Sequence, residues 1–247
     1  MNNPANAGGP QTRDRILGRL ERALSRKSGP VFFAGPGNRG FENAGDDIRY
    51  ASEPLPAPDR SPAKRLERLK RLLEAMRAEV HLVPESDWQA ELGAYLRKRE
   101  FGTALYGPGS EVGEAVKAQC GEAVAPEAIP YAEPVESFKE RLFGGIDVGV
   151  TSARSAIAEN GALVLWPDEK EPRLMSLIPP VHIAVLRASD IHNTFADAMA
   201  AEDWAAGVPT NVVLISGPSK TADIELVLAF GIHGPKELVV FIRADEA

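Results

Sequence analysis

A run of small and polar residues near the end of the sequence has the composition of an anion-binding turn. It follows the apolar segment 211–215 and reads Ser216-Gly217-Pro218-Ser219-Lys220-Thr221-Ala222-Asp223-Ile224-Glu225. If 221–230 forms a helix, the free amides at its start would bind a phosphate or carboxylate, with Ser219, Lys220 and Thr221 as candidate ligands. A ligand-free capped turn, with the two acidic residues near the helix start, fits equally well. The Gly-x-x-x-x-Gly-Lys spacing of a P-loop is absent.

Two hydroxyl residues and a glutamate lie close together in the segment 149–161. Thr151 and Ser152 stand where an apolar strand is expected to end, so their hydroxyls could bind a polar ligand. Glu159 precedes Asn160-Gly161, which is a strong turn signal. A carboxylate on such a turn could act as a nucleophile or a general base, or could simply be exposed to solvent.

One arginine and two histidines are further candidates. Arg173 could bind an anion through both of its terminal nitrogens. His182 enters an apolar strand, where a histidine is more often a core residue than a ligand. His233 lies in the turn 231–235 and is the best acid–base candidate among the four histidines. This turn leads into a strand, so a parallel sheet would separate it from the run at 216–225 unless the sheet is mixed.

The elements that must position these residues alternate along the chain. We expect helices over 61–76, 87–98, 111–119, 135–143, 194–205 and 221–230. We expect strands over 79–83, 103–106, 146–151, 162–165, 181–186, 211–215 and 237–242. This order predicts an α/β fold with a mostly parallel sheet and helices on both faces.

The N-terminal part of the chain has a different composition. Residues 12–26 show an apolar stripe at helical spacing with a basic opposite face, which is either a solvated surface or a docking helix for an acidic partner. The segment 29–62 is rich in glycine and proline, which indicates a linker or an extended arm. We therefore expect a helical and flexible arm over 1–60 and one α/β domain over 61–247.

Composition limits the classes of protein that remain. The chain has 247 residues, 44% hydrophobic residues and a formal net charge of −7, which suits a globular protein and not one that binds nucleic acid. No apolar stretch approaches the roughly 18 residues of a membrane span, and no signal peptide is evident at the start, so we expect a cytoplasmic protein. Cys120 is the single cysteine, and no His-x-x-x-His spacing occurs, so no metal site is expected.

Four stretches of the sequence closely resemble the lactate-utilisation (LUD) domain family: 149–161, 173–183, 215–225 and 231–235. The likeness extends over about residues 60–243. It implies a fold like that of the NagB/RpiA/CoA-transferase superfamily and a role in the oxidation of L-lactate to pyruvate. It also implies two partner proteins that carry iron–sulfur clusters. A chain with one cysteine cannot hold such a cluster by itself, so this chain is expected to bind no cofactor alone.

The resemblance carries over particular positions. Those that match the family motifs are Thr151, Glu159, Arg173, Ser176, His182, Ser219, Lys220, Thr221, Asp223, Glu225 and His233. Glu159 and His233 are the candidate catalytic residues, and the roles of four positions are open: Ser176, His182, Asp223 and Glu225. Asn160 departs from the Thr or Ser usual in the family, and the resulting Glu-Asn-Gly is similar to the catalytic glutamate motif of class I CoA-transferases.

Three functions compete at this point. The first is an accessory subunit of an L-lactate oxidation system that has no redox centre of its own. The second is a stand-alone enzyme on a CoA ester or a phosphorylated small molecule, in which Glu159 attacks an acyl group. The third is a module that senses a small anionic ligand without turnover.

Overall fold

The computed structural model describes residues 60–120, 125–222, 228–230 and 233–245. These ranges leave out the expected arm over 1–60 except for its last residue, and with it the helix expected at 12–26. They also leave out the candidate residues Asp223 and Glu225. The helices and strands below all belong to the unit that begins at Pro56.

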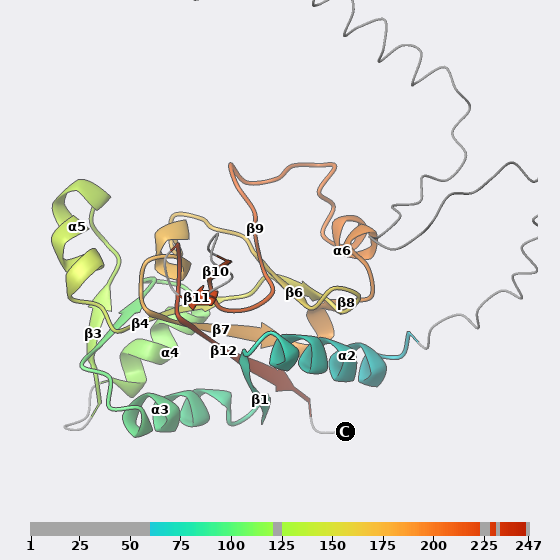
Figure 1. The fold of residues 1–247 in the computed structure, drawn as a ribbon, viewed down its shortest axis with the longest axis horizontal. Helices are drawn as coiled ribbons and strands as arrows, with labels where there is room; N and C mark the ends of the chain where they lie inside the picture. The colour runs from blue at the N-terminus through green and yellow to red at the C-terminus, as the bar shows by residue number, and fades with distance from the viewer. Residues whose placement is uncertain (1–59, 121–124, 223–227, 231–232, 246–247) are drawn as a thin grey trace, which may run out of the picture. The chain divides into compact units, whose positions relative to one another are not determined.

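A six-stranded sheet forms the centre of the described chain (Figure 1). Its strands, in spatial order, are β1 (Glu79–Pro84), β12 (Glu237–Ala244), β7 (Val181–Arg187), β4 (Val148–Ser152), β2 (Thr103–Tyr106) and β3 (Glu127–Pro130). Every neighbouring pair is parallel. Six of the seven residues of β7 are buried, as both faces of a central parallel strand require. The predicted mostly parallel α/β fold is confirmed.

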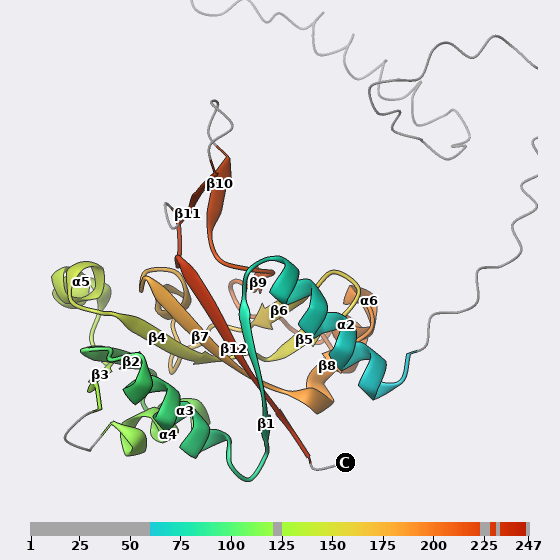
Figure 2. The same cartoon turned by 60° about the horizontal axis from the view of Figure 1, so that its bottom comes forward.

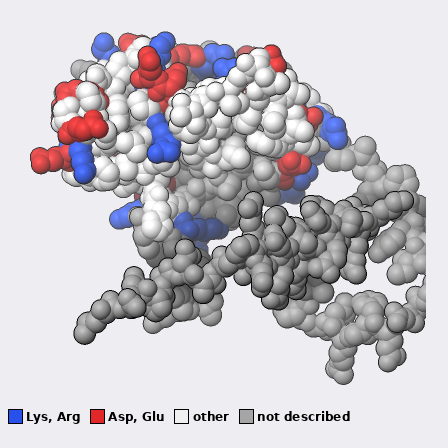
Figure 3. Space-filling view, turned by 90° about the horizontal axis from the view of Figure 1, so that it is seen from above, with Lys and Arg blue, Asp and Glu red and all other residues white. Residues whose placement is uncertain are grey.

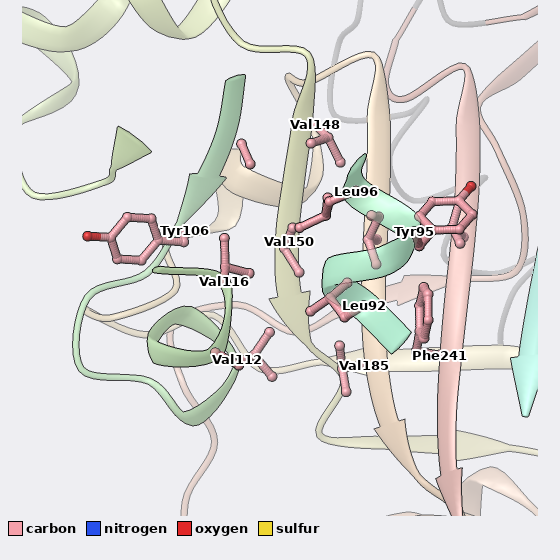
Figure 4. Packing of buried hydrophobic residues seen from close by; sticks show 14 of the residues in the cluster. Leu92, Tyr95, Leu96, Tyr106, Val112, Val116, Val148, Val150, Val185 and Phe241 are labelled. Carbon is pink, nitrogen blue, oxygen red and sulfur yellow. The ribbon is translucent and has the colours of Figure 1, made fainter. Parts of the chain in front are cut away.

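Helices cover both faces of this sheet. They are α2 (Pro62–Ala75), α3 (Trp88–Lys98), α4 (Glu111–Gln119) and α5 (Val135–Gly144). Phe241 of β12 packs with α3 and α4, whereas Ile242, on the opposite side of the strand, packs with Leu69 of α2. Leu105 of β2 packs with Phe138 of α5. Figure 4 shows α3 and α4 on the first face, where Leu92, Leu96, Val112 and Val116 meet Val148 and Val150.

A second sheet lies on the α2 side and was only partly expected. Its strands, in spatial order, are β8 (Ile191–His192), β5 (Ser155–Ile157), β6 (Ala162–Leu165) and β9 (Val213–Ile215). It is mixed, because β5 pairs parallel with β8 and β6 pairs antiparallel with both β5 and β9. Leu163 and Leu165 share a core cluster with Val240 of the central sheet. The connections from β4 to β7 and from β7 to β12 therefore fold over one face of the central sheet.

Short elements complete the second layer. Two 3-10 turns, η1 (Arg173–Ser176) and η2 (Ala188–Asp190), flank β7 along the chain. Helix α6 (Phe195–Ala201) starts at Thr194 with a capping box formed with Asp197, and it is shorter than the expected 194–205. Ala198 of α6 packs on Ile157 and Val164 of the second sheet.

The expected helix over 221–230 is wrong. Strand β10 (Lys220–Ala222) pairs antiparallel with β11 (Leu228–Phe230), and this ladder stands apart from both sheets in Figure 2. Ser219 and Thr221 consequently cap no helix, and the helix start that motivated an anion site there is missing from the described residues. The apolar residues Ile224, Leu226, Leu228 and Phe230 recur at every second position, so the segment carries a strand period as well as a helix period.

The surface of the described unit carries both charges. On the face seen in Figure 3, acidic and basic side chains are interspersed, and neither forms a continuous patch over the coloured residues. No helix in the ranges that the structure covers is both long and apolar enough to cross a membrane.

Candidate functional site

A cavity of about 250 Å³ lies at the amino ends of β7 and β12. We call it the amino-edge cavity, and its polar lining consists mainly of Ser176, His182, Ser216, Ser219 and His233. Four of these five are positions where the sequence matches the LUD family motifs. The structure therefore brings together candidate residues from three separate stretches of the chain.

Ser219 lies beside the 233–235 turn because of the second sheet. The Ser219 backbone N–H donates to the Pro235 carbonyl at 2.8 Å. A wholly parallel fold would have separated them, but β9 belongs to the mixed sheet and runs antiparallel to β6. The residues that follow β9 line the same cavity as His182 and Leu238, so the chain leaves β9 at the amino edge of the central sheet, where His233 also lies.

His182 is the innermost polar side chain of this cavity. It is fully buried, and its Nε2 lies 2.9 Å from Thr151 Oγ1. Burial lowers the pKa of the His182 imidazole to about 4, so the ring is neutral near pH 7. Its Nδ1 has no hydrogen-bond partner among the residues that the structure describes. His182 is thus both a core residue and a cavity residue, and the two interpretations of this histidine are compatible.

Gly149 supports the wall of the site that Ser176 belongs to. It pairs in register with His182, and a Cβ at this position would lie 2.2 Å from the Met175 carbonyl oxygen. Only glycine therefore lets the η1 turn lie directly on β4. That contact places Ser176, whose hydroxyl donates to the Arg173 carbonyl at 3.0 Å, in the wall of the cavity.

Other candidate residues lie at the opposite edge of the central sheet. A cleft of about 230 Å³ there, the carboxyl-edge cleft, is lined by Glu111, Ser152, Glu171, Arg187, Asp190 and Arg243 among others. Glu171 accepts hydrogen bonds from the Ser152 backbone N–H at 2.8 Å and from its hydroxyl at 2.6 Å. Thr151, Ser152 and the exposed Arg173 also line a much narrower recess beside this cleft.

An ion-pair network occupies the carboxyl-edge cleft. Arg243, only 5% exposed, donates to both carboxylate oxygens of Glu111 at 2.6 and 2.8 Å, and Arg187 adds a third bond at 2.9 Å. The hydrogen bond from Arg243 holds the pKa of Glu111 below its usual range. Sequence reasoning missed Glu111, Glu171 and Arg243. Glu111 begins α4 and Arg243 lies near the end of β12, which is a signal, but the two are too far apart in sequence for their pairing to be recognised.

Glu159 is separate from both sites. It lies on the turn between β5 and β6 and lines neither the amino-edge cavity nor the carboxyl-edge cleft. Its carboxylate accepts from the Phe195 backbone N–H at 3.2 Å, and its carbonyl accepts from Arg68 at 3.0 Å. Lys220 is exposed, with its Nζ 3.6 Å from Met76 Sδ. The side chain of Thr221 lies outside the described part of the structure.

Known proteins share this sequence and fold. An uncharacterized protein, NMB1437, of Neisseria meningitidis is 38% identical over 179 residues, which cover 71% of this chain and 76% of that protein. Lactate utilization protein C of Macrococcus caseolyticus is 36% identical over 104 residues, covering 40% of this chain and 45% of the relative. The protein of that name from Bacillus subtilis is 35% identical, covering 40% and 43%. The match thus spans less than half the length of these two lactate utilization proteins.

The fold has a counterpart among crystal structures. A DUF162 family protein from Deinococcus radiodurans superposes with a TM-score of 0.51 at 19% identity, over 74% of this chain and 98% of that chain. The sequence profile of the LUD domain matches residues 66–242, which is most of the described unit. The chain belongs to the LUD domain family.

Proposed function

We propose that this protein is a component of an L-lactate oxidation system, in which it binds a small anionic ligand and acts with iron–sulfur partner proteins. One observation carries the proposal: motif residues from three stretches, the buried His182 among them, line a single cavity. The names of two relatives, both lactate utilization protein C, point to the same process. The proposal assigns electron transfer to the partners and ligand binding to this chain.

The side chains available in this chain support ligand binding and not electron transfer. Burial raises the pKa of the single thiol, Cys120, to about 11, so this residue is a poor thiolate ligand near pH 7. The amino-edge cavity instead offers hydroxyl groups and imidazoles, which bind and orient a small acid through hydrogen bonds. His233 is exposed at the rim and completes this set.

The alternative of a CoA-ester enzyme gains no support from the arrangement of Glu159. Its carboxylate is bonded near the start of α6, and His233 lines the amino-edge cavity instead. The expected anion site on a helix start at 219–221 has also lost its physical basis. A module that senses the ligand without turnover differs from the proposal only in its effect on lactate metabolism.

Growth of a deletion strain tests the proposal. Loss of the gene in a strain without a paralogue should prevent growth on L-lactate and leave growth on pyruvate intact. The full chain should restore growth, and so should Arg141→Ala, which removes an exposed ion pair with Glu127; neither residue lines the cavity. Normal growth of the deletion strain on L-lactate would contradict the proposal.

Purification under anaerobic conditions tests the partner proteins. The tagged full chain, isolated from lactate-grown cells, should carry iron together with two cluster-bearing proteins in near-equal amounts. An iron-free single chain would separate this protein from the redox machinery and favour the sensing role.

A further inference from the structure

The two ring nitrogens of His182 have different surroundings. Nε2 is 2.9 Å from the hydroxyl oxygen of Thr151, a residue that is itself 4% exposed. Nδ1 is buried without a hydrogen-bond partner in the described chain, and His182 lines the amino-edge cavity. Buried polar atoms in native proteins nearly always have a partner, so this nitrogen calls for a group supplied by a ligand or by water.

The hydrogen bond with Thr151 is compatible with either tautomer of the His182 ring. A threonine hydroxyl both donates and accepts, and a neutral imidazole carries its single proton on either nitrogen. When the hydroxyl donates to Nε2, the proton resides on Nδ1, which is then a donor. When Nε2–H donates to the hydroxyl, Nδ1 is an acceptor. The change between these states alters no net charge in the buried site.

The surroundings of His182 suit a neutral ring that exchanges between its two tautomers. The pKa of about 4 keeps the imidazole uncharged near neutral pH. Gly149, which pairs with His182 across the strands, brings the η1 backbone against the sheet and closes the site from that side. Hydroxyl groups of Ser216 and Ser219 and the ring of His233 stand elsewhere in the lining, where they can donate to a carboxylate.

We propose that the Thr151–His182 pair lets the amino-edge cavity bind both a 2-hydroxy acid and the corresponding 2-oxo acid. The hydroxyl of the first donates to bare Nδ1, and the carbonyl of the second accepts from Nδ1–H. The choice of this ligand class rests on the proposed function, whereas the two-state ring rests on the geometry alone. The pair is a binding and positioning device, and no covalent or electron-transfer step is assigned to it.

Nitrogen-15 NMR of the full chain, labelled at its histidine rings, tests the proposal directly. Spectra are recorded without ligand, with saturating L-lactate and with saturating pyruvate, and His182→Gln identifies the signals. We expect Nδ1 to be unprotonated with L-lactate and protonated with pyruvate, while Nε2 shows the reverse. The same tautomer with both acids, a doubly protonated ring, or no change at His182 would overturn the proposal.

Two substitutions at Thr151 provide a matched pair. Thr151→Val keeps the shape of the side chain but removes the hydroxyl, and it should weaken the binding of both acids by about tenfold. Thr151→Ser keeps the hydroxyl and should stay within about twofold of the unmodified chain. Circular dichroism confirms that both variants are folded. Equal affinities of the folded Val and Ser variants would contradict a role for the hydroxyl.

The failures of the two proposals are distinguishable. If His182 changes tautomer as expected but the deletion strain grows on L-lactate, the cavity binds such acids and the proposed function is wrong. If the deletion strain fails on L-lactate but His182 responds to neither acid, the proposed function stands and this inference is wrong.

Discussion

The two ends of the central strands differ in the charge of their buried polar groups. At the carboxyl edge, Arg243 and Arg187 both bind Glu111, and one carboxylate oxygen of Glu171 accepts from Ser152, while Glu171 Oε1 and Arg243 Nε are buried without a partner among the described residues. At the amino edge, His182 is neutral and buried, and its Nδ1 has no partner in the ranges described. Both edges thus hold buried polar atoms without a partner, but the carboxyl edge holds them within a network of charged side chains and the amino edge on a neutral ring.

This contrast qualifies a general rule of open α/β folds. Ligands usually bind at the carboxyl ends of parallel strands, where neighbouring connections leave in opposite directions. In this chain the connection after β2 leads to β3, on one side of it in the sheet, and the connection after β4 leads to β7, on the other side. The point where the connections diverge therefore lies between β2 and β4. An ion-pair network lines it, while the second sheet forms a cavity at the other edge. Strand order alone therefore does not locate the binding site when return connections build a second layer.

The largest effect is expected at Gly149, which supports the amino-edge cavity. Gly149→Ala places a Cβ 2.2 Å from the Met175 carbonyl oxygen, so η1 must move away from β4. We expect a loss of at least about 3 kcal/mol in the free energy of unfolding, measured by urea denaturation. Gly144→Ala is the control, because a Cβ there meets no atom within 4 Å. Equal stabilities of these two variants would show that η1 is not tightly packed on β4.

The next effect is the pH dependence that His182 gives to stability. Its pKa is about 4 in the folded chain, against a usual value of 6.5, because burial penalises the charged ring. Between these values the unfolded chain binds the proton and the folded chain does not. The contribution of His182 is therefore complete above pH 6.5 and declines by about 3 kcal/mol as the pH falls to 4.

Urea denaturation across this pH range checks the prediction. The difference in unfolding free energy between the unmodified chain and His182→Gln should change with pH by that amount, since glutamine does not titrate. Thr151→Ser, which retains the neutral imidazole, should follow the unmodified chain. Parallel curves for the unmodified chain and His182→Gln would mean that the ring is accessible to water.

The strands and helices of the central layer were largely predictable from the sequence. Buried parallel strands are continuous apolar runs, and the helix 111–119 and the strand 103–106 have the expected bounds, as does the strand 162–165 of the second sheet. The error at 221–230 has a physical cause, because that segment carries apolar residues at both the helix and the strand period. Strands β5 and β8 have only three and two residues, too few for any periodicity to be recognised.

The site was predictable in its residues but not in its arrangement. Ser176, His182, Ser219 and His233 all match motif positions and all line the amino-edge cavity. Their convergence depends on the second sheet, whose shortest strands leave no pattern in the sequence. The pairing of Arg243 with Glu111 spans 132 residues, so no local signal announces it.

A smaller effect is expected from the ion pairs of the carboxyl edge. Arg243→Met removes the two bonds to Glu111 and the stacking of the guanidinium 4.8 Å above the Trp88 ring. We expect a loss of about 2 kcal/mol in unfolding free energy, because Glu111 is half exposed and regains water. Arg141→Met, at an exposed pair with Glu127, should cost less than about 0.5 kcal/mol. The affinity for L-lactate should be unchanged in both variants, and a large loss in Arg243→Met would place the ligand at the carboxyl edge.

The smallest effect compares one serine from each edge. Ser152→Ala removes the 2.6 Å bond to Glu171 but leaves the bond from the backbone N–H, and Ser176→Ala removes the 3.0 Å bond to the Arg173 carbonyl. Each substitution deletes one hydroxyl and one hydrogen bond, so each should cost about 1 kcal/mol in unfolding free energy. Because Ser176 lines the amino-edge cavity and Ser152 does not, only Ser176→Ala should also weaken the binding of L-lactate. Calorimetric titration with L-lactate compares the affinities of the two variants, whose unfolding free energies should be nearly equal. Weaker binding in Ser152→Ala alone would place the ligand at the carboxyl edge.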